Sequence, residues 1–192
     1  ASAFFGRSYD STVIAAALDA ATAKVNGSTS ESSVSLPGSQ KVVVNLSGSN
    51  EGLTLAKLIE AKSILGKNET PMGEQKYFVH RQEQLDDLLN NVNQVSDSDF
   101  AAVKALVNGE VNYFMGFEFC PTQLVAVDGS DIASTFAYTR SGIVAGITSA
   151  FDARVEQIPT KNYSYQVWAE QDIGATRVQE EGVVEILCDQ SP

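Results

Sequence analysis

The spacing of apolar residues predicts a helix at the beginning of the chain, over Ser2 to Lys24. Phe5, Tyr9 and Val13 recur at intervals of four residues. Residues three and four apart share one face of an α-helix, so this spacing gives a single apolar stripe. In residues 25–40, Gly, Ser and Pro replace any periodicity, which indicates a loop.

The middle of the chain mixes helical and strand patterns. The clearest helix begins after Thr54, a favourable N-cap residue, and ends near Gly66. Further amphipathic helices are predicted over residues 82–91 and 96–109. Short apolar or aromatic runs predict strands over residues 41–46, 76–80 and 110–121, the last broken by Gly116 and stopped by Pro121.

The final third of the chain changes to strand patterns separated by turn residues. Strands are predicted within residues 135–147, 152–159, 163–172 and 183–187. Helices therefore come first, a mixture follows, and strands dominate the end. This order predicts an α+β fold and differs from the regular strand-helix alternation of a doubly wound sheet.

The composition indicates a folded chain with an acidic surface. Hydrophobic residues make up 43% of the 192 positions and charged residues 19%, which is enough apolar material for a core. Twenty-four acidic residues against thirteen basic ones give a net charge of -11. This charge repels nucleic acid. If DNA is a partner, we expect the protein to enclose it rather than bind it. No apolar run is long enough to span a membrane.

Cysteine usage and the start of the chain bear on the compartment. Cys120 and Cys188 are the only cysteines, which fits a reducing compartment rather than a disulfide scaffold. The chain shows no secretion signal and does not begin with methionine, so we expect a trimmed start or a part of a longer product. Four N-x-[ST] triplets, at Asn26, Asn45, Asn68 and Asn162, are therefore interpreted as chance occurrences.

His80 is the only histidine and is the first candidate for a catalytic base. It ends a predicted strand just before a helix, and Cys120 is the thiol that would act beside it as a nucleophile. Neither residue lies in a recognisable catalytic motif, and a cysteine within an aromatic run is ordinarily a buried, inert thiol. The sequence therefore favours a protein that is not an enzyme. A small cytosolic hydrolase using Cys120 and His80 is the alternative.

Metal, phosphate and nucleic-acid sites find no support in the spacing of residues. One histidine and two distant cysteines do not make a zinc site. The acidic residues at 97–99 and 128–131 lack the closing glutamate of an EF-hand loop, which favours solvated turns. No glycine-rich phosphate loop is present, and the basic residues are scattered singly. No metal and no cofactor is therefore expected.

A charged segment near the C-terminus holds Arg177, Glu180 and Glu181. Adjacent carboxylates on a strand point to opposite faces, so the two glutamates would not converge on one substrate. Ion pairs between strands or between subunits are the better interpretation of this segment.

Three segments carry a resemblance to a known family. They are residues 52–65 (GLTLAKLIEAKSIL), 105–119 (ALVNGEVNYFMGFEF) and 159–186 (PTKNYSYQVWAEQDIGATRVQEEGVVEI). These segments resemble the major capsid proteins of tailed bacteriophages and, more narrowly, the branch whose shell subunit has the Hong Kong 97-type fold. The third segment is the most distinctive, and the resemblance runs in the same order through most of the chain.

The resemblance implies a peripheral (P) domain with a long spine helix and long strands, and an axial (A) domain inserted between them. Residues 1–39 would begin the P domain with the spine helix, residues 40–150 would form the A domain, and residues 151–192 would complete the P domain with its return strands. Family members usually carry an N-terminal arm and an extended E-loop before the spine helix, and this chain matches neither. Because arm and loop clasp neighbouring subunits, we expect this piece alone to assemble poorly.

The resemblance also implies a function, that of a structural major capsid protein of a tailed double-stranded DNA bacteriophage. Copies would form the hexamers and pentamers of an icosahedral head, assembled in the host cytoplasm and present in the virion. The expected partners are further copies, scaffolding, portal or decoration proteins, and packaged DNA held without sequence-specific contact, with no membrane.

Particular residues are expected at the contacts between capsid subunits. Residues 121–134, small and polar, would form the tip of the A domain. Weak ion pairs between subunits are predicted for Arg154, Glu156, Arg177, Glu180 and Glu181.

Two further alternatives remain besides the hydrolase. A gene transfer agent or a cellular nanocompartment would use the same subunit fold, and its cargo would distinguish it. A secreted, glycosylated binding module would need a signal peptide upstream.

Overall fold

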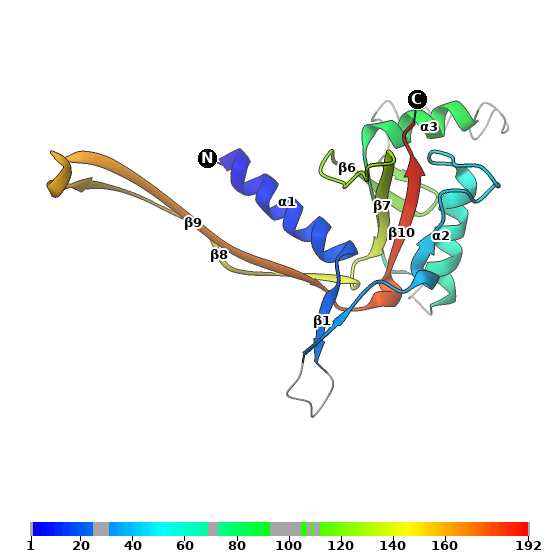
Figure 1. Cartoon of the computed structure of the whole chain (residues 1–192), viewed down its shortest axis with the longest axis horizontal. Helices are drawn as coiled ribbons and strands as arrows, with labels where there is room; N and C mark the ends of the chain where they lie inside the picture. Colours follow the sequence, from blue (N-terminus) through cyan, green and yellow to red (C-terminus); the bar gives the residue numbers. More distant parts are fainter. Residues whose placement is uncertain are drawn as a thin grey trace.

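The molecule has three parts, which Figure 1 shows: a body of sheet and helices, a long two-stranded ribbon, and a helix beside the ribbon. The computed structural model describes residues 2–24, 31–68, 73–92, 105–106, 109 and 112–191. The first helix, α1 (Ser2–Leu18), and the ribbon extend from the same side of the body. This mixture of helices and strands confirms the predicted α+β class.

The body is built on a six-stranded mixed sheet with the strand order β3-β10-β7-β4-β6-β5. Its strands are β3 (Lys41–Val42), β4 (Lys76–His80), β5 (Tyr113–Phe114), β6 (Phe117–Pro121), β7 (Ile132–Thr139) and β10 (Val183–Asp189). β3 pairs in parallel with β10, β4 pairs in parallel with β6, and the other neighbours are antiparallel. The last strand of the chain therefore lies inside the body, between β3 and β7.

Side chains alternate along these strands and give the sheet two apolar faces. The helices α2 (Leu55–Lys67) and α3 (Gln82–Val92) cover one face. The core there includes Leu58, Leu65, Leu85, Leu88, Phe78, Phe119, Val184 and Ile186. A second cluster consists of Ala17, Leu36, Val79, Val125, Phe136 and Val183. Phe78 and Val79 are neighbours in β4 but belong to different clusters, so the sheet is buried on both sides.

The first helix is shorter than the sequence predicted. α1 ends at Leu18, and β1 (Ala21–Lys24) pairs antiparallel with β2 (Glu31–Val34). The helix prediction was therefore wrong over β1, and the predicted loop contains β2 and a 3-10 helix, Gly38–Gln40. Residues 25–30 of that loop lie outside the described residues. Neither short strand has an apolar pattern, so the pairing between them, not local propensity, explains why they are strands.

The predicted start of α2 is confirmed. The Thr54 side chain accepts a hydrogen bond from the backbone N–H of Lys57 at 3.4 Å, as an N-cap does. The helix continues one residue beyond Gly66, to Lys67. Lys57 itself is buried, and its ammonium donates to the carbonyls of Glu51 (2.6 Å) and Leu187 (2.9 Å). This side chain therefore ties α2 to β10.

Other predicted elements are confirmed only in part. The strand over residues 76–80 is present, and the described part of residues 110–121 forms the hairpin of β5 and β6. Its turn at Met115 and Gly116 has positive φ angles (53° and 95°), which suit a two-residue hairpin. The strand predicted over residues 41–46 is present only as β3, Lys41–Val42. The helix predicted over residues 96–109 lies largely outside the described residues.

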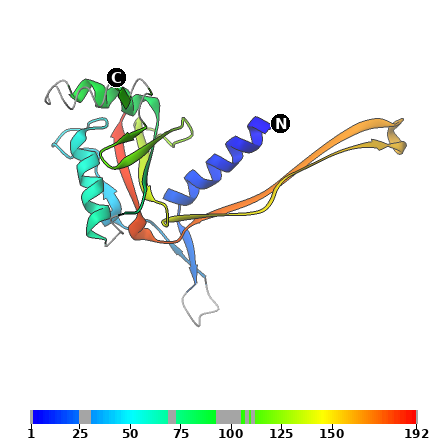
Figure 2. The same ribbon diagram turned by 180° about the vertical axis from the view of Figure 1, so that it is seen from behind.

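The ribbon consists of β8 (Ile143–Ile158) and β9 (Ser164–Arg177), joined by a turn that begins with the 3-10 helix Pro159–Lys161. β8 and β9 pair antiparallel and form a sheet of their own. Figure 2 shows the ribbon reaching well beyond the end of α1. Two irregularities between Ile147 and Asp152 each add one residue to β8. Because two residues are added in total, side chains of β8 alternate in the same way before and after this stretch. Odd-numbered residues of both strands therefore lie on the same face of the ribbon along its length.

α1 packs against the odd-numbered face of the ribbon near the body. Along β9, half-buried Ile173 and Ala175 alternate with exposed even-numbered residues, and β9 and α1 lie in contact there. Ala175 lines a shallow groove together with Ala15 and Ala16 of α1. The small side chains of α1 therefore allow close packing against β9.

The elements do not follow the predicted boundaries at residues 39 and 150. β8 runs through residue 150, and β10 lies in the same sheet as β3, β4 and β7. The division into A and P domains stays a prediction. None of the described helices is both long and apolar enough to cross a lipid bilayer.

Candidate assembly surfaces

Arg177 forms a buried clasp between the ribbon and the rest of the chain. It ends β9, and only 4% of its surface is exposed. Its guanidinium donates hydrogen bonds to the carbonyls of Ala17 (2.9 Å), Asp19 (3.0 Å) and Val34 (3.1 Å). Ala17 lies in the last turn of α1, where carbonyls lack helical partners and a cation is favoured. One side chain thus joins β9, the end of α1 and β2.

The sequence predicted ion pairs of Arg177, Glu180 and Glu181 between strands or between subunits. Within the single chain the arginine has other partners, and a role at a subunit contact stays a prediction. Among the described residues, no ion pair joins Arg177 to either glutamate, and its partners are backbone carbonyls. A single charged residue between Thr176 and Val178 looks like a surface residue in sequence. The carbonyls that it binds come from segments more than 140 positions away, so no local signal reveals the clasp.

Glu180 and Glu181 lie in the 3-10 helix Glu180–Gly182, at the corner where the chain leaves the ribbon and enters β10. Glu181 is exposed and Glu180 is half-buried. The carbonyl of Glu181 accepts a hydrogen bond from the Asn68 side chain at 3.2 Å, which ties this corner to the end of α2. Their role at a subunit interface stays a prediction.

Arg154 and Glu156 lie on the even-numbered face of the ribbon. The Arg154 guanidinium pairs with Asp152 at 3.0 Å and lies 5.7 Å from the centre of the Trp168 ring. Arg154, Glu156, Gln166 and Trp168 line a shallow hollow of about 210 Å³. These side chains are exposed, so the ion pair between Arg154 and Asp152 is weak. Both predicted residues lie on a protruding surface, and their role at a subunit interface stays a prediction.

His80 and Cys120 lie on opposite faces of the sheet. His80 stacks on Phe78 (ring centres 5.5 Å apart) and lies 5.3 Å from the Phe119 ring, on the face covered by α2 and α3. Cys120 is the partner of Val79 in the β4–β6 pairing and packs with the second cluster. It also lines an open hollow of about 510 Å³ beneath α1, which His80 does not line. The two side chains therefore cannot form a nucleophile and base pair.

The chemistry of both groups points away from catalysis. The His80 Nδ1 lies 2.7 Å from the carbonyl of Arg81, and its Nε2 is buried without a partner. Burial lowers the pKa of His80, so the ring stays neutral. Burial likewise raises the pKa of the Cys120 thiol, which keeps it in the unreactive form. The hydrolase alternative is therefore dropped.

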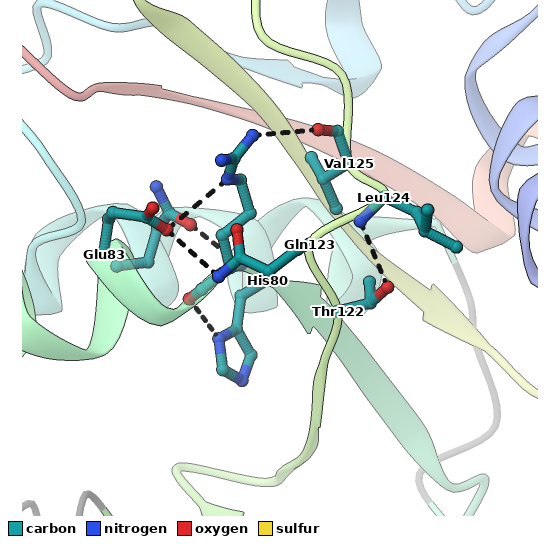
Figure 3. Close-up of polar contacts among 8 residues, drawn as sticks. His80, Glu83, Thr122, Gln123, Leu124 and Val125 are labelled. Atoms are coloured by element: carbon teal, nitrogen blue, oxygen red, sulfur yellow. Dashed lines mark hydrogen bonds and ion pairs between the residues drawn. The ribbon is translucent and has the colours of Figure 1, made fainter. Parts of the chain in front are cut away.

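A polar network holds the loop between β6 and β7 against the start of α3, as Figure 3 shows. The Arg81 guanidinium donates to the carbonyl of Val125 (3.3 Å) and pairs with Glu83 (3.4 Å), which also accepts from Gln123 (3.5 Å). The backbone N–H of Thr122 donates to the carbonyl of His80 at 2.8 Å. The loop predicted as the A-domain tip, residues 121–134, is thus anchored at its first part.

The acidic turn within this loop is explained without a metal. Asp128 accepts hydrogen bonds from the backbone N–H groups of Ser130 (2.8 Å) and Ile132 (3.0 Å). An aspartate that bonds the backbone two residues on stabilises a turn. In the part of the chain that the structure describes, no three His, Cys, Asp or Glu side chains gather as a metal site would require.

The fold is similar to those of solved shell proteins. The capsid of Ralstonia phage GP4 matches with a TM-score of 0.62 and 13% identity, covering 98% of this chain and 66% of that one. The capsid of cyanophage P-SCSP1u gives 0.60 and 15%, covering 94% and 60%. The holo-SrpI encapsulin of Synechococcus elongatus PCC 7942 gives 0.53 and 10%, covering 79% and 53%. The chain thus spans between 53% and 66% of the lengths of these structures.

The likeness to these structures confirms the Hong Kong 97-type fold that the sequence segments suggested. A comparison with curated proteins finds no match. The family model described as "Phage capsid protein" matches residues 1–190. Because that match covers nearly all of the 192 residues, the chain belongs to the phage capsid protein family.

Proposed function

We propose that this chain is a structural subunit of the shell of a tailed double-stranded DNA bacteriophage, its major capsid protein. Copies join as hexamers and pentamers in the virion, around DNA that they contain without reading its sequence. The subunit is assembled in the host cytoplasm and catalyses no reaction.

The observation that carries this proposal is the ribbon. Strands of 16 and 14 residues project from the body, with exposed side chains over most of their outer part. An isolated two-stranded hairpin is at best marginally stable in water. A shell of identical copies, related by symmetry, supplies the neighbours that such a ribbon needs. Membership of the capsid family supports the same conclusion.

We also propose a domain division that follows the elements. The six-stranded sheet with α2 and α3 corresponds to the A domain, and α1 with the ribbon corresponds to the P domain. β10 then belongs with the A domain instead of the P domain, because it pairs with β3 and β7. The segment of residues 121–134, most of it the loop between β6 and β7, lies at the end of the body next to α3 and offers the A-domain tip.

Polar contacts between subunits fall on the even-numbered face of the ribbon and on the nearby corner. Arg154 and Glu156 are placed to meet a neighbour, and Glu180 and Glu181 lie at the corner. Exposed ion pairs each contribute about 0–1 kcal/mol, so they select register and leave errors reversible. Arg177 is assigned to the internal clasp instead.

Electron microscopy of the full-length product tests the proposal. The expected result is closed particles of uniform size with hexameric and pentameric units. A product that stays monomeric under all assembly conditions, with or without its scaffolding partner, contradicts it. Extraction of the cargo separates two kinds of shell: double-stranded DNA supports the phage head, whereas a cargo without DNA indicates a cellular nanocompartment.

A further inference from the structure

His80 is a polar side chain enclosed in apolar surroundings at the end of β4. None of its surface is exposed, and its ring lies against the rings of Phe78 (centres 5.5 Å apart) and Phe119 (5.3 Å). Its Nδ1 lies 2.7 Å from the carbonyl oxygen of Arg81. A carbonyl oxygen only accepts, so Nδ1 carries the proton of the neutral ring. Nε2 is then a buried lone pair, and none of the described residues bonds to it.

A second proton on this ring is unfavourable as long as the ring stays buried. It would bind at Nε2, where the described residues offer no acceptor, and it would put a positive charge among aromatic rings. Burial therefore lowers the pKa of His80, and the hydrogen bond to the Arg81 carbonyl opposes this shift only in part. Protonation favours any conformation in which the ring reaches water.

The ionisable side chains of the neighbouring strands supply no counter-charge. Those of β6 and β7 lie on the opposite face of the sheet: Glu118, Cys120 and Tyr138. They pair with Tyr77 or Val79, which alternate along β4 with Phe78 and His80. Lys76 shares the face of His80 but lies at the other end of β4.

The ionisable side chains of the helices on this face are bound elsewhere. In α3, Glu83 pairs with Arg81, Asp86 accepts a hydrogen bond from Gln82, and Asp87 accepts one from the backbone N–H of Leu53. In α2, the buried ammonium of Lys57 donates to two backbone carbonyls. A charged His80 therefore has no carboxylate to pair with unless the contacts around it change.

His80 and Arg81 also hold the loop between β6 and β7 and the start of α3. The carbonyl of His80 accepts from the backbone N–H of Thr122 at 2.8 Å, and the Arg81 guanidinium donates to the carbonyl of Val125 at 3.3 Å (Figure 3). The backbone N–H of Arg81 donates to the Gln84 side chain in the first turn of α3 at 2.9 Å. A movement that brings the ring to water must move the backbone that makes these contacts.

The contacts of this loop are few and polar, whereas β10 pairs with β7 along its whole length in the core. Segments with few buried apolar contacts open at a lower free energy than core strands do. The loop and the start of α3 can therefore open while the rest of the sheet stays closed.

We propose that His80 is an acid-sensitive latch. Its neutral ring keeps the loop of residues 122–125 and the first turn of α3 on the sheet, and its protonation releases both. The closed form binds the second proton more weakly than the open form, so the latch opens as the pH falls below about 6.5, the ordinary value for histidine. The proposal concerns the folded subunit itself and does not depend on the proposed shell function.

Two substitutions in the same network test the latch in the unassembled full-length product. His80→Gln removes the titrating ring, whereas Glu83→Gln removes an exposed carboxylate that binds Arg81 and leaves the ring in place. NMR follows the imidazole signal of His80. Hydrogen exchange of the Thr122 and Arg81 amides is measured relative to that of Ile186 in β10, with each rate corrected for its intrinsic pH dependence.

The expected result is a local opening that depends on His80 alone. Exchange at Thr122 and Arg81 should rise relative to Ile186 by up to about tenfold between pH 7.5 and pH 5.5, because only the open form binds the proton with ordinary affinity. Glu83→Gln should keep this rise, and His80→Gln should lose it. An equal rise in His80→Gln, or its loss in Glu83→Gln, overturns the assignment to His80.

The unsubstituted chain decides the question if His80→Gln does not fold. The imidazole signal and the Thr122 amide signal should then change together over one pH range, since the ring takes up its proton only in the open form. A ring that becomes protonated while exchange at Thr122 stays constant contradicts the latch. A loop that opens around a neutral ring, or a constant exchange ratio down to pH 5.5, contradicts it as well.

Discussion

The body and the ribbon of this protein obtain their order from different sources. The body buries its sheet on both sides, and Phe78, Phe117 and Phe136 are almost completely inaccessible to water. In the outer part of the ribbon, by contrast, Val155, Tyr165 and Val167 are mostly exposed. Burial of apolar surface is the main stabilising contribution to folding. The body therefore holds itself together, whereas the ribbon depends on what lies beside it.

The joint between the two regions shows how the ribbon is fixed to a stable base. Arg177 binds three carbonyls from α1 and its neighbouring segments. Gly142 and Gly182 also meet there, and a Cβ at Gly142 would lie 2.9 Å from the carbonyl oxygen of Gly182. The contacts are polar and tight but few. A projecting element can therefore be oriented by a small joint while most of its surface stays exposed.

The largest expected loss of stability follows a substitution in the core of the body. Phe78→Ala removes a buried ring and should lower the free energy of unfolding by about 3–5 kcal/mol. Val167→Ala on the ribbon should change it by less than about 0.5 kcal/mol in the unassembled chain, because the site is exposed. Urea denaturation followed by circular dichroism measures both. A cost at Val167 as large as that at Phe78 would show that the ribbon is buried within the single chain.

The next effect concerns the joint. Arg177→Met retains much of the side-chain length but leaves three carbonyls without their donor, so the free energy of unfolding should fall by about 2–4 kcal/mol. Hydrogen exchange should rise at the end of α1 and in β2. Arg154→Met, on the same ribbon but exposed, is the matched control and should leave both exchange rates unchanged. Equal exchange patterns in the two variants would rule out the clasp.

A smaller, pH-dependent effect arises in the body. Burial lowers the pKa of His80 in the folded chain, so the unfolded chain binds the proton first as the pH falls. Stability should therefore decrease below about pH 6.5, by at most about 1.4 kcal/mol per pH unit. His80→Gln should have a flatter dependence between about pH 7.5 and pH 5.5. Chemical denaturation at several pH values gives the slopes, and parallel slopes would mean that the pKa of His80 is the same in the folded and the unfolded chain.

The smallest expected change in stability concerns the even-numbered face of the ribbon. Arg154→Ala removes the ion pair with Asp152 and the contact with Trp168, both exposed. The free energy of unfolding should change by less than about 1 kcal/mol. The Trp168 fluorescence should nevertheless change, because the cation leaves the ring. A cost well above this value would indicate that the even-numbered face is more constrained than its exposure suggests.

The elements with strong local signals were predictable from the sequence. Apolar spacing and the Thr54 cap give α2, and the run that ends at His80 gives β4. The ribbon strand β9 had a weaker signal, because Trp168 stands among the polar positions that alternate with Tyr165, Val167 and Ala169. β1 and β2 had no such signal, because their small and polar residues are typical of a loop. Only the pairing of the two segments with each other makes them strands.

The α+β class and the family could be predicted from the sequence, because they depend on local periodicity and recognisable segments. The placement of His80 and Cys120 on opposite faces, the burial of Arg177 and the return of β10 to the body became visible only in the folded chain. Each of these depends on contacts between segments far apart along the chain. Local spacing carries no information about which distant carbonyl or strand a residue will meet, and packing settles that choice.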